Sequence, residues 1–223
     1  MELKGYYWFK EGNEYYGQGK YDKAIECYEK VIKLHPNSDG AYFNIAGAYY
    51  FKGNYYKAIE CYEKGIYLNP DYKKAYKYMG ISYQKTGNYD KAIECYKIAI
   101  ELKPDDGETY FFMGNAYRFI GYYNQAIECY EKVIELKLDS VSVYNNMGIS
   151  YQKTGNYDKA IECYKIAIEL KPDYAEAYNS MGTAYEDKGN YDYAIKCYEK
   201  AIELNPNHTL AYDNKRIAYL KKI

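Results

Sequence analysis

The chain has 223 residues and a formal net charge of -1 at pH 7. This balance argues against a nucleic-acid-binding protein, which usually needs a concentrated basic surface, and no apolar stretch approaches the roughly 20 residues that span a bilayer. The composition holds 36 tyrosines but only two histidines, so the most common catalytic base and metal ligand is nearly absent.

Residues 1–4 are expected to form a short N-terminal leader. They lack the apolar core of a secretory signal, which favours a cytoplasmic protein. After them, a period of 34 residues organises the chain, as its evenly spaced cysteines show: Cys27, Cys61, Cys95, Cys129, Cys163 and Cys197. The period predicts six units, at residues 5–38, 39–72, 73–106, 107–140, 141–174 and 175–208, followed by a half-unit at residues 209–223.

Each unit is expected to form two helices, as residues 73–106 illustrate. Apolar residues such as Tyr76 and Tyr83 recur at helical spacing in the first part of this unit. Gly87 then suits the left-handed end of a helix, and Pro104 ends the second helix because it lacks an N–H group. Neither helix can bury its apolar stripe alone, so the two are expected to pair as an antiparallel hairpin that stacks on its neighbours.

Small residues explain how such hairpins would pack closely. In the same unit Gly80, Ala92 and Ala99 carry little side chain, so two helix backbones can approach each other. Tyrosine recurs at four positions of nearly every unit, and these rings are expected to fill the core beside the small residues. We therefore assign most of the 36 tyrosines to packing rather than to function.

Several recurring pairs of residues resemble the signature of the tetratricopeptide repeat family. The pairs are Trp8/Tyr42, Gly12/Ala46, Tyr15/Tyr49, Ala24/Ala58, Tyr28/Tyr62 and Pro36/Pro70. The match covers nearly the whole chain in six consecutive copies. The resemblance implies an all-α, right-handed superhelical solenoid of six helix-turn-helix repeats and a C-terminal capping helix, thirteen helices in all. It also implies a scaffold or adaptor that binds a protein or peptide.

Two residues depart from the family pattern. Leu138 stands where the other five units carry proline, so the fourth junction is expected to be more continuous or differently angled. Gly65 replaces an alanine in a second helix, at an expected cost of about 1 kcal/mol in helix propensity. Residues 79–105 and 147–173 are identical, so neither segment is expected to hold a unique active site.

The sequence offers no constellation for catalysis, metal binding or a cofactor, and we expect a protein that is not an enzyme. The cysteines are expected to be free packing residues, because neighbouring helices lie about 8–10 Å apart while a disulfide requires Cα atoms within about 7 Å. His35 and His208 are expected in turns between units. No phosphate-binding, dinucleotide-binding or serine-nucleophile motif occurs.

A second stripe on the first helices is expected to form the binding surface. In proteins that this chain resembles, the stripe lines a concave groove that receives ligands. Five of the six phenylalanines lie on it, and water-facing aromatic side chains usually mark a contact surface. Along the chain the stripe changes from aromatic to basic to acidic, which would fix the direction of a bound segment. The predicted groove residues are Tyr6, Phe9, Asn13, Tyr16, Phe43, Asn44, Tyr50, Phe51, Lys74, Lys77, Phe111, Asn115, Arg118, Phe119, Asn145 and Asn179.

The sequence leaves three alternatives open. The phenylalanines could instead pack between repeats and stiffen the array. The protein could associate with itself as a homo-oligomer, through its end faces or its convex tyrosines. It could also bind the C-terminal carboxylate of chaperone peptides, as some relatives do: Asn13, Asn44 and Lys74 match that clamp, whereas Phe9 and Tyr78 replace two of its cations.

The last half-unit is expected to cap the array. Lys215 and Arg216 occupy positions that are apolar or small in the preceding units, and polar residues suit a terminal helix that faces water. We therefore expect a finished solenoid that folds by itself.

Overall fold

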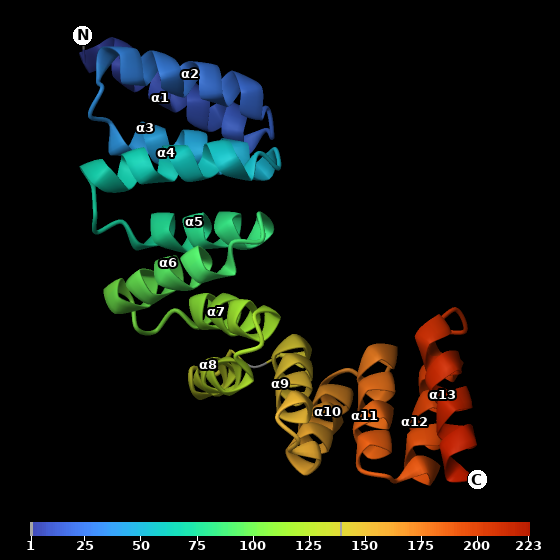
Figure 1. Cartoon of the computed structure of the whole chain (residues 1–223). Helices are drawn as coiled ribbons and strands as arrows, with labels where there is room; N and C mark the ends of the chain where they lie inside the picture. The colour runs from blue at the N-terminus through green and yellow to red at the C-terminus, as the bar shows by residue number, and fades with distance from the viewer. Residues whose placement is uncertain (1, 139) are drawn as a thin grey trace. The chain divides into compact units, whose positions relative to one another are not determined.

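Helices account for the regular secondary structure of the chain. A computed structural model describes residues 2–138 and 140–223, and in these residues it contains thirteen α-helices and no strand (Figure 1). The all-α repeat prediction, with two helices in each unit and a final single helix, is confirmed. The helices are α1 (Glu2–Gly17), α2 (Tyr21–Leu34), α3 (Asp39–Phe51), α4 (Tyr55–Leu68), α5 (Lys73–Lys85), α6 (Tyr89–Leu102), α7 (Gly107–Phe119), α8 (Tyr123–Glu135), α9 (Val141–Lys153), α10 (Tyr157–Leu170), α11 (Ala175–Asp187), α12 (Tyr191–Leu204) and α13 (Thr209–Lys222).

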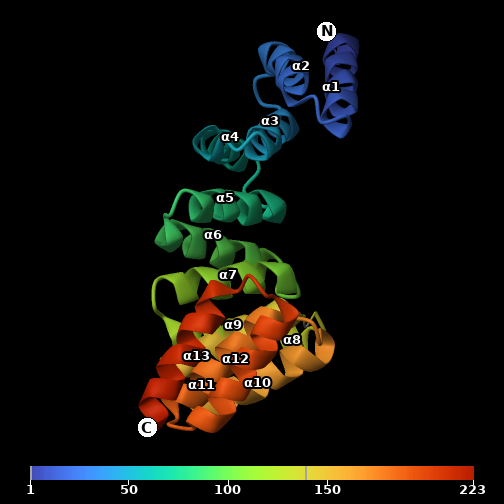
Figure 2. The ribbon, with the colours of Figure 1, turned by 90° about the vertical axis from the view of Figure 1, so that its right-hand side faces the viewer.

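Two compact units divide the chain, Met1–Ala116 and Tyr117–Ile223. In the N-terminal unit α1 pairs with α2, α3 with α4 and α5 with α6, while α2 and α4 also pack on α3 and α5. In the C-terminal unit α9 pairs with α10 and α11 with α12, while α8, α10 and α12 pack on α9, α11 and α13. First helices also meet within each unit, because α3 contacts α5 and α11 contacts α9 and α13. In Figure 2, α1 lies to the right of α2, and α3 lies to the right of α4.

A glycine in the left-handed region joins the two helices of every hairpin. The six glycines at these turns, from Gly19 to Gly189, have φ angles between 71° and 84°, a conformation that is costly for residues with a Cβ atom. In four of the turns an asparagine follows and caps the second helix. Asn88, for example, accepts a hydrogen bond from the backbone N–H of Lys91 at 3.3 Å. The predicted role of Gly87 is thereby confirmed.

A tyrosine ring packed against a glycine forms the centre of several hairpins. Tyr96 is fully buried, and a Cβ atom added to Gly80 would lie 2.6 Å from its ring. Gly12, Gly148 and Gly182 face buried tyrosines in the same way. The hydroxyl of Tyr96 donates a hydrogen bond to Oε1 of Gln84 at 2.8 Å, so the buried phenol is not left unpaired. For these rings, the prediction that the recurring tyrosines serve packing is confirmed.

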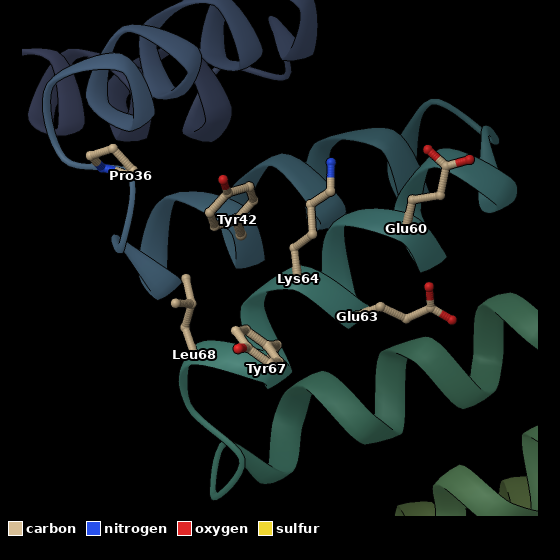
Figure 3. A pocket seen from close by; sticks show the side chains of 7 residues that line it. All are labelled: Pro36, Tyr42, Glu60, Glu63, Lys64, Tyr67 and Leu68. Atoms are coloured by element: carbon tan, nitrogen blue, oxygen red, sulfur yellow. The ribbon is translucent and has the colours of Figure 1, made fainter.

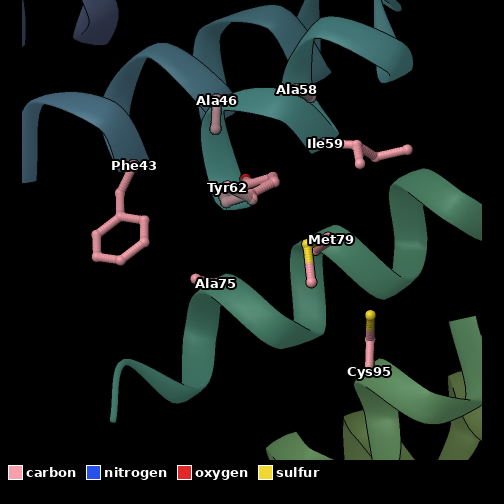
Figure 4. Close-up of a cluster of buried hydrophobic side chains, with 8 residues drawn as sticks. All are labelled: Phe43, Ala46, Ala58, Ile59, Tyr62, Ala75, Met79 and Cys95. Carbon is pink, nitrogen blue, oxygen red and sulfur yellow. The ribbon is translucent and has the colours of Figure 1, made fainter. Parts of the chain in front are cut away.

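The second and third repeats share a hydrophobic cluster in the N-terminal unit. Figure 4 shows its buried side chains, which come from α3, α4, α5 and α6. They are Phe43, Ala46, Ala58, Ile59, Tyr62, Ala75, Met79 and Cys95. Burial raises the pKa of Cys95 to about 12, with a smaller contribution from Glu94. Its thiol therefore stays protonated and acts as a small packing group.

The two identical segments of the chain adopt the same local structure in different units. In each, the tyrosine near the end of the first helix donates a hydrogen bond to a glutamate of the preceding repeat. Tyr83 donates to Glu63 at 3.0 Å, and Tyr151 donates to Glu131 at 3.1 Å. Each bond joins a repeat to the one before it, so the same contact between repeats recurs at two places in the array.

The fourth junction, between α8 and α9, is built differently from the others. α8 ends at Glu135, whereas the other second helices continue to a leucine one residue later in their repeats. The N–H of Leu138 donates to the carbonyl of Val133 at 3.1 Å, and the N–H of Lys137 donates to that of Ile134 at 2.9 Å. This pattern needs an N–H group where the other repeats have proline. Leu138 thus allows α8 to end early. Of the two outcomes expected for this junction, the more continuous one is wrong, and the different angle stays a prediction.

Lys137 adopts a strained backbone conformation at this junction. Its φ is 58°, the one positive φ outside glycine in the described residues, and an L side chain in this region costs about 1 kcal/mol. We expect Lys137→Gly to raise the free energy of unfolding by roughly 0.5–1 kcal/mol, measured by urea denaturation. Lys171 holds the same position in the next repeat with a φ of -144°, so Lys171→Gly is the matched control and should give no gain. Equal effects of the two substitutions would contradict the assignment of strain to Lys137.

Candidate functional site

The predicted groove residues lie on first helices and differ in exposure. Those up to Asn115 belong to the N-terminal unit, and the others belong to the C-terminal unit. Five are exposed (Tyr6, Asn13, Phe51, Lys74 and Phe119), eight are half-buried (Phe9, Tyr16, Asn44, Tyr50, Lys77, Phe111, Asn115 and Arg118), and three are buried (Phe43, Asn145 and Asn179). The three buried residues do not present their side chains to solvent.

Phe43 lies in the core rather than on a water-facing stripe. The residue is 8% exposed, and its ring stacks on Tyr72 with ring centroids 4.4 Å apart. A Cβ atom at Gly65 would lie 2.4 Å from the ring, so the glycine of α4 provides the space that the ring fills. The expectation that Phe43 faces a ligand is therefore wrong. Gly65 was expected only to lower helix stability, but its lack of a side chain makes the room that the Phe43 ring needs.

Phe9 also makes packing contacts. Its ring meets that of Tyr28 edge-on at 5.7 Å, and it packs against the hydrophobic cluster between the first two repeats. The alternative in which phenylalanines pack between repeats therefore holds for Phe9 and Phe43. Phe51 and Phe119 differ from them, because they are 56% and 55% exposed.

Phe51 lies at the centre of an aromatic cluster that reaches the surface. Its ring stacks on Tyr21, with centroids 5.6 Å apart and an interplanar angle of 10°. It also meets the rings of Tyr16 and Tyr50 edge-on, at 6.0 Å and 5.3 Å. Tyr50 in turn contacts two further rings. We call these six residues the Phe51 cluster: Tyr16, Tyr21, Tyr50, Phe51, Tyr55 and Tyr78.

Sequence reasoning found half of the Phe51 cluster. Three of the six residues were predicted on the groove stripe. Tyr21 and Tyr55 belong to the recurring tyrosines that were assigned to the core, and Tyr78 was considered only because it replaces a cation of the chaperone clamp. Tyr21 and Tyr55 are the first residues of α2 and α4, and each hairpin turn brings them back beside the end of a first helix. The signal that could have found them is a tyrosine directly after the turn, next to an aromatic residue directly before it.

Two tyrosines of the Phe51 cluster, Tyr16 and Tyr50, are uncharged at neutral pH. Burial, with smaller contributions from Tyr21 and Tyr78, raises the pKa of Tyr16 to about 12. Burial is also the main cause that raises the pKa of Tyr50. Both phenols therefore keep their protons across the physiological range, and these two residues offer apolar ring faces and neutral hydroxyl groups.

The expected basic middle of the groove is partly neutralised. Lys77 forms ion pairs with Glu108 at 2.6 Å and with Asp106 at 3.3 Å. Burial alone would raise the pKa of Asp106, but Lys77 and Thr109 outweigh it, and the pKa is lowered. Lys74, in contrast, is exposed and forms no ion pair within the described residues. The positive charge available on this surface is therefore that of Lys74 rather than that of Lys77.

Two of the residues that match the chaperone clamp bind each other. Nδ2 of Asn44 donates to Oδ1 of Asn13 at 3.1 Å, and the hydroxyl of Tyr28 donates to the same oxygen at 2.8 Å. The carbonyl oxygen of the Asn13 amide is therefore satisfied. Asn13, Asn44 and Lys74 lie on α1, α3 and α5, and their use as a carboxylate clamp stays a prediction.

The first helices of the C-terminal unit present polar groups that mostly bind one another. Oδ1 of Asn179 accepts a hydrogen bond from an amide of α13 at 3.1 Å, and Lys221 forms an ion pair with Glu186 at 2.8 Å. Arg118 lies over the ring of Phe119, 4.7 Å from its centroid. The acidic end that the sequence predicts is therefore partly neutralised by Lys221.

Groups that could bind a metal do not gather in the described parts of the chain. No set of histidine, cysteine or acidic side chains there is arranged to hold a metal ion. The six cysteines are free thiols, and burial raises the pKa of Cys61, the most accessible of them, to about 11. Within residues 2–138 and 140–223, every helix is too short or too polar to cross a bilayer.

Comparisons with known protein families identify repeated helical hairpins. A family model described as "Tetratricopeptide repeat" matches residues 40–72, 74–106 and 175–208. A second model, described as "TPR repeat", matches residues 12–53, 114–155 and 151–189. No curated protein sequence matches the chain at a significant level.

Solved structures of similar proteins cover most of the chain. A structure of MamA is 32% identical, with a TM-score of 0.70, and the match covers 74% of this chain and 96% of that one. YrrB, described as a TPR protein with an unusual peptide-binding site, is 22% identical with a TM-score of 0.77, covering 86% and 99% of the two chains. The C-terminal part of a TPR repeat-containing protein from Cytophaga hutchinsonii is 24% identical with a TM-score of 0.79, covering 94% and 84%. The last two likenesses concern the fold alone.

Proposed function

This chain belongs to the tetratricopeptide repeat family, and from that premise we propose that it is a protein-interaction scaffold that binds an extended or helical peptide on the first helices of its N-terminal unit. The contact surface is the Phe51 cluster, and Lys74 supplies an exposed positive charge on the same face of that unit. The role is non-catalytic and requires no cofactor. YrrB, which shares the fold, is described as having a peptide-binding site, and this supports a peptide as the ligand.

The exposed ring of Phe51 supports the proposal most directly. The residue is 56% exposed, and apolar surface left in water costs about 25 cal/mol per Å² relative to burial. Aromatic anchors in preformed surroundings are the side chains that most often dominate binding energy. Here Tyr21 and Tyr16 hold the ring from neighbouring helices, so little ordering is required when a ligand arrives.

The position of the cluster also supports a ligand that lies across several repeats. Its six residues come from five helices, α1 to α5, so an occupant of the cluster contacts three repeats at once. An apolar or aromatic side chain of the ligand would pack on Phe51, and an acidic group would pair with Lys74 on α5. This combination defines the peptide that we expect: apolar at its anchor, with an acidic group that reaches Lys74.

We expect Phe51→Ala to weaken peptide binding by about 2 kcal/mol, roughly 30-fold, because it removes the anchor ring. Stability should fall by about 1 kcal/mol or less, because more than half of the residue is already in water. Phage-displayed peptides selected on the full chain would supply the ligands, and fluorescence polarisation of these peptides would give the dissociation constants.

Tyr56→Ala is the control for this substitution. Tyr56 is an exposed aromatic residue, 70% exposed, outside the Phe51 cluster, and its removal should leave the dissociation constants unchanged. The proposal is wrong if selected peptides bind the Phe51→Ala variant as tightly as the parent chain, or if no peptide is enriched on the chain at all.

Exposed apolar side chains on α13 support self-association as a second candidate function. Leu210, Tyr212 and Leu220 are 60%, 50% and 69% exposed, which is unusual for so many large apolar residues on one short helix. Light scattering over a range of concentrations separates the two candidates. A mass that rises with concentration favours self-association, and a constant monomeric mass counts against it.

A further inference from the structure

A pocket lies on the N-terminal unit away from the Phe51 cluster, at the C-terminal half of α4. Figure 3 shows Tyr42 of α3, together with side chains of α4 and the proline of the turn before α3. Its volume is about 450 Å³. We call it the Tyr67 pocket, and its lining residues are Pro36, Tyr42, Glu60, Glu63, Lys64, Tyr67 and Leu68. In Figure 3, Lys64 stands between the two tyrosine rings on one side and the two carboxylates on the other.

Tyr67 distinguishes this pocket from the same place in the other repeats. It is 87% exposed, so the fold does not require an aromatic ring here. The other five repeats carry charged residues at its position, namely Lys33, Glu101, Glu135, Glu169 and Glu203. An exposed aromatic side chain that replaces a charged one beside a cavity adds a π face where the other repeats have none.

The first repeat shows what an aromatic ring at the position of Tyr42 can bind. Trp8 occupies in that repeat the position of Tyr42, and Nζ of Lys30 lies 3.7 Å from the centroid of the Trp8 ring. This is a close cation–π contact. Lys64 holds the position of Lys30 in the second repeat. The chain's own first repeat is thus a precedent for a cation over the aromatic residue at this position.

Negative charge predominates around the pocket, and a hydrogen bond holds one of its two carboxylates. Glu60 and Glu63 contribute two carboxylates against the single ammonium group of Lys64. The hydroxyl of Tyr83, on the next repeat, donates to Oε1 of Glu63 at 3.0 Å, which holds that carboxylate at the pocket. Two carboxylates beside two aromatic rings are the surroundings that stabilise a cation.

Lys64 is free to move aside when a ligand enters. In the fourth and sixth repeats the lysine at this position pairs with the glutamate that replaces Tyr67, at 2.7 Å for both Lys132–Glu135 and Lys200–Glu203. Tyr67 cannot form such a pair, and Lys64 has no ion-pair partner within the described residues. Its long side chain is therefore held by no charge at this site.

We propose that the Tyr67 pocket binds a lysine or arginine side chain of a partner polypeptide, between the rings of Tyr42 and Tyr67 and against the carboxylates of Glu60 and Glu63. The pocket is separate from the Phe51 cluster, so a chain that uses both surfaces would hold two segments: an apolar one on the first helices and a basic one here. Binding at the Tyr67 pocket does not depend on the proposed function of the first helices.

The test is a titration of the full chain with the peptide acetyl-(Arg-Gly)3-amide, followed by ¹H–¹⁵N NMR at about 150 mM salt, where long-range attraction is screened. We expect the backbone signals of Tyr42, Lys64 and Tyr67 to shift, while acetyl-(Glu-Gly)3-amide leaves them in place. Tyr67→Lys, which introduces the residue found at this position in the first repeat, should weaken binding of the arginine peptide about tenfold, because it removes a ring and adds a repelling charge.

A matched pair of double variants distinguishes binding at the Tyr67 pocket from general electrostatic attraction between the chain and a basic peptide. Glu60→Gln/Glu63→Gln should weaken binding of the arginine peptide about tenfold. Glu128→Gln/Glu131→Gln makes the same change of charge at the same positions of the fourth repeat and should change binding by less than about twofold. The proposal is overturned by equal weakening in the two double variants, by shifts that only the glutamate peptide produces, or by no shift of these signals with either peptide.

Discussion

Phe43→Ala is expected to lower the free energy of unfolding of the N-terminal unit by about 3–4 kcal/mol. Phe43 is 8% exposed and packs in the cluster that joins the second and third repeats, beside Tyr62 and Ala75. Removing the ring takes away its contact with Tyr72 and leaves a cavity that the surrounding helices can close only in part. Gly65, which lies against the ring, has no side chain with which to fill that space.

Urea denaturation followed by circular dichroism measures this loss. Phe51→Ala is the control, because it removes the same side chain from the same helix, and there the residue is 56% exposed. It should cost about 1 kcal/mol or less. The core placement of Phe43 is wrong if the two substitutions destabilise the chain equally, or if Phe43→Ala abolishes peptide binding while stability stays unchanged.

Gly65→Ala is expected to destabilise the chain by about 2 kcal/mol, although alanine is the better helix former by about 1 kcal/mol. A Cβ atom at this position would lie 2.4 Å and 2.6 Å from two carbon atoms of the Phe43 ring. Such distances are too short for non-bonded carbon atoms, so the ring or the helix must move. The ring has little freedom to do so, because Tyr72 stacks on it with centroids 4.4 Å apart.

The sign of this effect should reverse when the ring is removed. In a Phe43→Ala background, Gly65→Ala is expected to be neutral or to stabilise the chain by up to about 1 kcal/mol, because the methyl group then occupies empty space. The difference between the two backgrounds is a coupling energy of about 2–3 kcal/mol, measured by a double-mutant cycle. Gly17→Ala is the control, since a Cβ atom there meets nothing within 4 Å. Additive effects of the two substitutions would contradict the direct contact.

The repeating framework could be predicted from the sequence because its signals are local and repeated. Gly87 needs a left-handed conformation that its φ of 80° confirms, and Pro104 follows the end of α6 at Leu102. The close fit of Gly80 against Tyr96 could be expected because small and aromatic residues recur together in the repeats. Each of these features depends on residues within one unit, and each occurs several times along the chain.

The features that the sequence did not reveal depend on residues in different helices or repeats. Phe43 and Gly65 were given separate meanings, one as a ligand contact and the other as a weakness, whereas a single contact explains both. Lys77 pairs with Glu108, which lies 31 residues further along the chain. No linear pattern distinguishes such a charge from a free one, so the exposed part of the stripe could not be separated from the packed part.

The two identical segments determine how this array can change in length. The same residues begin at Met79 and at Met147, at equivalent places in repeats that are separated by one other. Removal or duplication of the stretch from the start of one segment to the start of the other changes the array by two complete repeats, and every retained hairpin keeps its helical phase. The shorter product would still contain all six residues of the Phe51 cluster, since they precede the first segment. The array can therefore be shortened or extended in whole modules of two repeats without a new junction sequence.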